Sequence, residues 1–191
     1  MELSRQTPFG DLTVVDAQRN AVSLIQSNYM GFGSGIVPQQ TGFTLQNRGN
    51  LFSLDPQHAN AYAPRKRPFH TIIPAFVTRP TATGQEPWLS FGVMGGSMQP
   101  QGHVQVLLNL LLFDMDLQDA IDAPRFRHLD ELRVALETPV TELVRRQLTS
   151  MGHELVDETR FSFGGSQAVM RLERGWAAGS DPRKDGMAAG H

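Results

Sequence analysis

The segment Phe91–His103 places two adjacent glycines between the pattern of a strand and the pattern of a helix. Trp88–Met94 is mostly apolar, which is typical of a strand covered on both faces, while His103–Phe113 is rich in Leu and Val, as in a buried helix. At such a turn, Gly95 and Gly96 can direct backbone N–H groups toward one phosphate, carboxylate or oxyanion. A glycine pair before a helix also serves tight packing alone, so the pattern leaves both an anion site and a structural turn open.

The elements around this turn follow from hydrophobic periodicity and from the turn residues between periodic segments. We predict three hairpins, a long irregular loop, three helices and several short strands. Strands first, then helices, then strands again favour an α+β layered sandwich over a parallel doubly wound sheet. The hairpins pair 12–16 with 21–28, 69–78 with 88–94 and 166–171 with 177–179; the loop is 47–68; the helices are 102–113, 117–123 and 139–151; the other strands are 42–46, 132–136 and 153–158.

Length and composition predict one globular domain over residues 1–191. Hydrophobic residues make up 40% of the chain and the net charge is −2, so no basic footprint for nucleic acid appears. The one basic cluster, residues 65–67, lies between prolines and is most simply a solvated loop.

Several classes of site are excluded by missing residues. There is no cysteine, and no two of the six histidines have the i, i+4 spacing of a metal-binding helix, so we expect neither metal nor cofactor. P-loop, dinucleotide and Gly-x-Ser-x-Gly motifs are also missing. Residues 1–20 contain no apolar signal region, and the longest apolar run, 106–113, is too short to cross a bilayer. We therefore expect a soluble cytoplasmic protein without membrane partners.

A series of short motifs, taken together, resembles the small, C-terminal subunit of the γ-glutamyltranspeptidase family from about residue 12 to the end. Two further strings, 26–29 and 95–100, are closest to the acylase-like bacterial branch of that family. The motifs are Val14-Val15-Asp16, Asn20-Ala21-Val22, Gly31-Phe32-Gly33-Ser34-Gly35-Ile36, Lys66-Arg67-Pro68, Gly95-Gly96-Ser97, Ala123-Pro124-Arg125-Phe126 and Ser180-Asp181-Pro182-Arg183.

The resemblance implies an N-terminal-nucleophile hydrolase fold, in which two β-sheets lie between helices. In this family a precursor cuts itself before a threonine, whose hydroxyl attacks the γ-glutamyl carbonyl while its freed α-amine acts as base. Gly95 and Gly96 match the backbone donors of the oxyanion hole, and Ser27 matches a second threonine that hydrogen-bonds near the nucleophile. The family also implies a large subunit, which supplies an arginine for the substrate carboxylate.

The substrate side of the resemblance departs from the transpeptidases. Arg48 and Leu51 stand where those enzymes keep a Gln or Glu and an Asp to hold the α-amino and carboxylate groups, and Leu51 cannot accept a hydrogen bond from an ammonium. His70 and Thr71 replace a serine pair, and Tyr29 either lines the pocket or packs against the neighbouring loop. An acyl group without the ammonium, such as glutaryl, therefore becomes a candidate beside γ-glutamyl amides.

The nucleophile is the sharpest departure from the family. Its position, seven residues before Asp16, is occupied by Phe9. The acylase-like pattern Gly-Asp-Thr-x-Tyr-Leu appears as 10–12, Gly-Asp-Leu, as though the threonine and two neighbours were missing. Thr13 is too close to the strand and Thr7 is out of register by two, so both are weak candidates. Neither is at a free N-terminus, because Met1 begins the sequence.

Three functions remain open from the sequence. The first is an amidohydrolase or acyltransferase half that works with a separate large subunit. The second, which we favour for this chain, is an inactive remnant or binding partner that keeps the oxyanion loop without a nucleophile. The third is a non-catalytic anion-binding module. We expect His103 to be a cap or packing residue, and Asp181 with Arg183 to form an ion pair or turn that closes the tail.

Overall fold

The computed structural model describes residues 9–190. The chain divides into two compact units, each described by itself below. Unit 1 comprises residues up to Gly10 and Gln26–Ile72, and unit 2 comprises Asp11–Ile25 and Ile73–His191.

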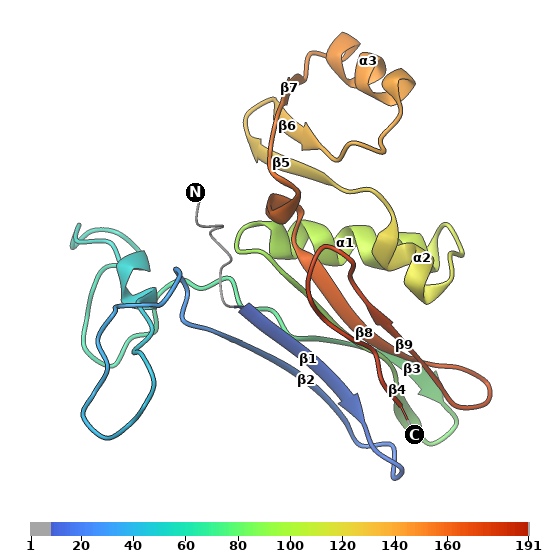
Figure 1. The fold of residues 1–191 in the computed structure, drawn as a ribbon, viewed down its shortest axis with the longest axis horizontal. Helices are drawn as coiled ribbons and strands as arrows, with labels where there is room; N and C mark the ends of the chain where they lie inside the picture. The colour runs from blue at the N-terminus through green and yellow to red at the C-terminus, as the bar shows by residue number, and fades with distance from the viewer. Residues whose placement is uncertain (1–8, 191) are drawn as a thin grey trace. The chain divides into compact units, whose positions relative to one another are not determined.

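A four-stranded antiparallel sheet forms the centre of unit 2 (Figure 1). The long apolar strand predicted before the glycine pair is its second member, and its register with the next strand runs from Leu89 opposite Met170 to Met94 opposite Gly165. The strand order is β3 (Ala75–Thr81), β4 (Gly84–Met94), β8 (Gly165–Arg171) and β9 (Trp176–Ser180).

Two layers cover the two faces of this sheet. On one face lie α1 (Met98–Leu111) and α2 (Leu117–Asp122), which share a core with Leu89, Phe91 and Val93 of β4. On the other face lies the hairpin of β1 (Phe9–Val15) and β2 (Ala21–Ser27), where Ser90 of β4 bonds to both hairpin strands. Because strand side chains alternate between faces, one strand supplies both layers. The predicted α+β sandwich is confirmed.

A second sheet in unit 2 has three strands and carries one helix. In it β6 (Arg133–Leu136) lies between β5 (Phe126–Asp130) and β7 (Glu154–Val156), antiparallel to the first and parallel to the second. The crossover between the parallel strands is α3 (Glu142–Ser150), whose N-cap Thr141 accepts a hydrogen bond from Val144 N. A short 3-10 turn, Arg160–Phe163, then leads into β8.

Unit 1 is largely irregular, with one 3-10 turn, η1 (Arg48–Leu51). The predicted loop over 47–68 is confirmed apart from that turn and an isolated bridge between Ser53 and Ala61. The strand predicted over 42–46 is wrong. Leu45 donates its N–H to Ile36 O and accepts from Ser34 N, so its backbone is bonded to the glycine-rich loop instead of a ladder.

Other predicted boundaries moved for local reasons. The second hairpin is confirmed, but its first strand begins at Ala75 instead of residue 69, and β5 was not predicted. α1 begins at Met98, because Pro100 is tolerated in a first turn. The helix is only half buried: Val104, Leu108 and Leu111 are exposed, so the expectation of a fully buried helix was wrong. No helix in the described part of the chain is long and apolar enough to cross a membrane.

Candidate active site

The Gly95-Gly96 turn joins β4 to α1 in a conformation that requires glycine. The φ angles are 127° at Gly95 and 61° at Gly96, both outside the usual range of residues with side chains. A β-carbon on Gly95 would also lie 2.9 Å from Gly164 Cα, whereas one on Gly96 would meet nothing within 4 Å. The first glycine is therefore needed for space and conformation, and the second for conformation alone.

The hydrogen bonds of this turn leave its donors free. The carbonyl oxygens of Gly95 and Gly96 accept from Met98 N and Gln99 N, both at 3.1 Å, and so belong to the first turn of α1. The N–H groups of the two glycines have no acceptor among residues 9–190. Two free donors at a helix N-terminus can stabilise an anion or a developing oxyanion.

Thr13, one of the two weak nucleophile candidates, points into the sandwich. Its hydroxyl lies 2.5 Å from Ser90 Oγ and 3.2 Å from Ser90 O, and Ser90 Oγ in turn donates to Val22 O. These bonds bridge the two β layers, which favours a structural role for Thr13. Thr7, the other candidate, lies outside the described residues.

Asp11 is a buried carboxyl between the same two layers. Both of its oxygens are sealed from water and have no hydrogen-bond partner in the described part of the chain. A β-carbon on Gly92 would overlap this carboxyl group, so only glycine fits opposite Asp11. Burial raises its pKa to about 7, and the nearby backbone N–H of Leu12 opposes that effect. The burial of Asp11 was not predicted from the sequence. The alternation of residue types along Asp11, Leu12 and Thr13 indicates a strand but does not show which of its two faces is buried.

Asp11 should make stability fall with rising pH. Between its ordinary pKa of 3.8 and its folded pKa of about 7 the folded chain holds more protons than the unfolded chain, so stability is lost across that window and is level above it. In Asp11→Asn, the loss of unfolding free energy between pH 5 and pH 8 should be smaller by about 2–3 kcal/mol, a figure that allows for the partial exposure of Asp11.

Urea unfolding at pH 5 and pH 8 measures that difference. Asp16→Asn is the matched control, because Asp16 is exposed and the Asn20 side chain lowers its pKa. An unchanged pH dependence in Asp11→Asn would show that the Asp11 carboxyl is solvated.

Three of the predicted site residues come together in unit 1. Ser27 Oγ accepts a hydrogen bond from Tyr29 N at 2.7 Å, and the Arg48 guanidinium carbon lies 5.0 Å from the centre of the Tyr29 ring. Asn47 holds the same loop, since its Oδ1 accepts from Met30 N and its N donates to Asn28 O. Burial lowers the pKa of Arg48.

The remaining candidate site residues of unit 1, His70 and Thr71, make fewer contacts. His70 is exposed, and Thr71 is half buried with a hydroxyl that lacks a partner among the residues described. Neither side chain forms a hydrogen bond with Tyr29 or Arg48 in the described structure. Their assignment to substrate binding stays a prediction.

His103 is buried in unit 2 and packs as a core residue. Its Nδ1 lies 2.6 Å from Gln99 O, its Nε2 lies 2.9 Å from Ile73 O, and its ring centre is 5.0 Å from that of Phe91. Burial lowers its pKa, while the contacts with the two carbonyl oxygens raise it. This environment supports the packing role of His103.

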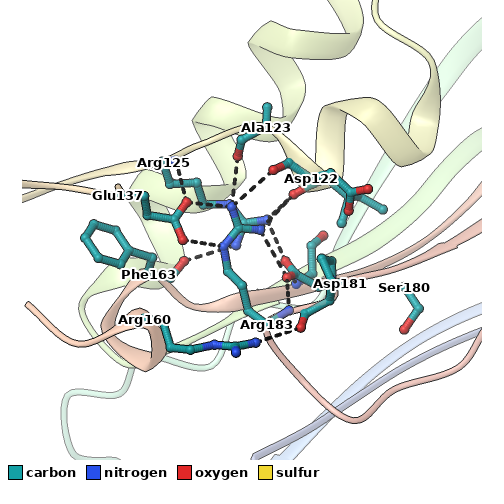
Figure 2. A network of polar contacts seen from close by, with 12 residues as sticks. Asp122, Ala123, Arg125, Glu137, Arg160, Phe163, Ser180, Asp181 and Arg183 are labelled. Carbon is teal, nitrogen blue, oxygen red and sulfur yellow. Dashed lines mark hydrogen bonds and ion pairs between the residues drawn. The ribbon is translucent and has the colours of Figure 1, made fainter. Parts of the chain in front are cut away.

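A buried ion network fixes the C-terminal tail (Figure 2). Asp181 accepts from Arg183 Nη1 at 3.1 Å, which confirms the expected pair, and from Arg125 Nη2 at 2.8 Å. Glu137 receives a two-point contact from Arg183 Nε and Nη2, at 2.7 and 2.6 Å. Arg125 and Glu137 were missed as network members, although Arg125 lies in one of the motifs quoted above.

Comparison with known proteins decides the family. The γ-glutamyltranspeptidase family model matches residues 9–191. The chain belongs to this family. A glutathione hydrolase-like proenzyme of Bacillus subtilis is 40% identical over 93% of the chain, and an oxamate amidohydrolase proenzyme of Klebsiella pneumoniae is 38% identical over the same share. The chain spans 34% of the length of each of these relatives.

Solved structures of the family share the fold. Cephalosporin acylase from Bacillus halodurans is 43% identical with a TM-score of 0.85, and the match covers 95% of this chain and 34% of that one. A γ-glutamyltranspeptidase chain from Pseudomonas nitroreducens is 30% identical with a TM-score of 0.85, and 98% of it is covered. The family's N-terminal-nucleophile fold and the kinship with the acylase-like branch are confirmed.

Proposed function

We propose that this chain is the oxyanion-bearing half of a γ-glutamyltranspeptidase-type amidohydrolase or acyltransferase, and that it lacks the nucleophile which this loop would serve. The observation that carries the first part is the pair of free N–H donors at Gly95 and Gly96. In an enzyme of this kind each donor stabilises the tetrahedral oxyanion, and losing one costs roughly 100- to 1000-fold in rate.

The geometry of β1 supports the loss of the nucleophile. A Gly-Asp pair that precedes the threonine in the acylase-like pattern has become part of the strand, and Asp11 is buried without a partner in the described structure. Burying a carboxyl group without a hydrogen-bond partner costs free energy, so this position is unfavourable for Asp11. The hydroxyl nearest in sequence, on Thr13, is bonded to Ser90.

The outer face of the β1–β2 hairpin supports a large-subunit partner. Leu12, Val14, Val22 and Leu24 alternate along the two strands and are each 47–52% exposed. A contiguous apolar sheet face of this kind marks a surface that another layer covers. In the proposed assembly that layer belongs to the large subunit, and the acylated compound is a γ-glutamyl or glutaryl amide.

The free donors also keep a simpler function open, that of a non-catalytic anion-binding module. Anion binding at the loop needs no nucleophile and no large subunit. Such a module would bind small oxyanions equally well with or without a partner.

Hydrolysis of γ-glutamyl-p-nitroanilide and glutaryl-p-nitroanilide tests the proposal. The purified chain should release no p-nitroaniline from either compound, alone or after mixing with the large subunit of an acylase-like relative. A chain with Thr-Ala-Tyr inserted between Asp11 and Leu12, cut to begin at the new threonine, should gain turnover with that large subunit. Turnover by the unaltered chain would overturn the loss of the nucleophile.

A further inference from the structure

Ser97 stands at the N-cap of α1 but does not cap the helix. Its hydroxyl oxygen accepts no hydrogen bond from the first turn, although serine is one of the residues that most often do so. Pro100, the third residue of that turn, has no N–H to donate, and the N–H of Gln99 is already bonded to Gly96 O at 3.1 Å. The Ser97 hydroxyl is therefore free to accept from a donor elsewhere in unit 2.

Arg127 of β5 supplies that donor. Its Nη2 donates to Ser97 Oγ at 3.3 Å, and its Nη1 donates to Ser162 O at 3.5 Å. Ser162 lies two residues before Gly164, the glycine whose Cα would be 2.9 Å from a β-carbon on Gly95. One guanidinium therefore joins the two segments that border the Gly95-Gly96 turn, the start of α1 and the 3-10 turn before β8.

Two glutamines of α1 hold the backbone of β5 on both sides of Arg127. Gln101 Nε2 donates to His128 O at 2.9 Å, and Gln101 Oε1 accepts from His128 N at 2.7 Å. Gln105 makes the same pair of contacts with Phe126, both at 3.0 Å. Since residues four apart lie on one face of a helix, the N-cap hydroxyl and the two glutamines form one stripe, and each contacts one residue of β5. The glutamines thus hold β5 against α1 without help from the Arg127 side chain.

We propose that Arg127 is a positioning residue for the Gly95-Gly96 turn and acts on it through the Ser97 hydroxyl. This inference rests on the proposed function and adds a residue to the same site. Glycine adopts many backbone conformations, so a glycine pair presents its two N–H groups to one anion only if neighbouring residues hold it. Donors that are held in place stabilise an anion better than mobile ones. Glu158 Oε1 lies 3.9 Å from Arg127 Nη1 and offsets part of the guanidinium charge, so the bond to Ser97 carries the effect.

Titration with inorganic phosphate, followed through the amide resonances of Gly95 and Gly96, tests this role. Phosphate should shift both resonances in the wild-type chain, and Arg127→Gln should weaken its affinity by about 5- to 10-fold. Ser97→Ala should weaken it by a similar factor although the arginine stays, and Ser97→Thr should keep the wild-type affinity because it keeps the hydroxyl. The double variant Arg127→Gln/Ser97→Ala should bind no more weakly than Arg127→Gln, because both changes remove the same hydrogen bond.

Arg133→Gln is the matched control, because it removes the same charge from the neighbouring strand β6, where Arg133 pairs with Asp130. It should leave phosphate affinity unchanged. Two results would overturn the inference: wild-type affinity in Arg127→Gln, which would make its contacts structural only, or equal losses in Arg127→Gln and Arg133→Gln, which would make net charge the cause. Both leave the proposed function untouched, since no turnover is measured. A wild-type chain whose Gly95 and Gly96 resonances ignore phosphate would instead contradict the anion-binding turn itself, and the inference with it.

Discussion

Asp181→Ala lowers the free energy of unfolding by about 3–5 kcal/mol, the expected cost of breaking a buried ion pair from one side. The Asp181 side chain is fully buried, and its two oxygens accept from Arg125, from Arg183 and from Ser166 N. Removing them leaves two guanidinium groups that only Glu137 and backbone carbonyls can serve. The tail after β9 also loses the side-chain bond to Ser166 N at the start of β8.

Asp130→Ala is the control for this prediction. Asp130 also pairs with an arginine, Arg133, at 3.1 Å, but both side chains are about half exposed. Exposed pairs contribute 0–1 kcal/mol, so this variant should unfold near the wild-type urea midpoint. Equal losses in the two variants would mean that the network of Figure 2 is solvated in solution.

Gly95→Ala and Gly96→Ala should differ although the two glycines are adjacent. Alanine at Gly95 meets the Gly164 backbone at 2.9 Å and must adopt a φ of 127°, so we expect a loss of about 2–4 kcal/mol and a displaced turn. Alanine at Gly96 has open space and a φ of 61°, in the left-handed region, at a cost of about 1–2 kcal/mol.

Urea unfolding of the two variants gives the stabilities, and amide exchange at residues 95–99 reports the shape of the turn. Gly96→Ala should retain the wild-type exchange pattern of α1, while Gly95→Ala should lose protection in its first turn. Equal losses would show that backbone conformation alone, and not the close approach to Gly164, constrains Gly95.

The layered fold could be predicted because its strands carry strong local patterns. Leu89, Phe91 and Val93 of β4, which face the helices, are all apolar, and the hairpins are marked by turn residues. The strand predicted over 42–46 failed because its backbone partners lie in the loop 34–36, a pairing that no local pattern shows. The prediction that the helix after the glycine pair is buried failed for another reason. A high content of Val and Leu does not show whether an apolar helix face packs in the core or remains on the surface.

Only the part of the site that depends on backbone conformation could be predicted from the sequence. Gly95 and Gly96 were found because few residues tolerate positive φ at a strand-to-helix turn. The missing partner of Arg48 and the burial of Asp11 could not be predicted, because both depend on which groups surround a side chain in space. The ion network was half predicted, since Asp181 and Arg183 are two residues apart in sequence, whereas Arg125 and Glu137 are distant.

Intact mass of the chain after reaction with glutaryl-p-nitroanilide tests the central claim most directly. The chain is mixed with the large subunit of an acylase-like relative, quenched in acid and compared with the cut variant, which begins with Thr-Ala-Tyr immediately before Leu12. The account predicts a covalent glutaryl adduct on the variant and none on the unaltered chain. A glutaryl adduct on the unaltered chain, mapped to Thr7, Thr13 or any other hydroxyl, would contradict it.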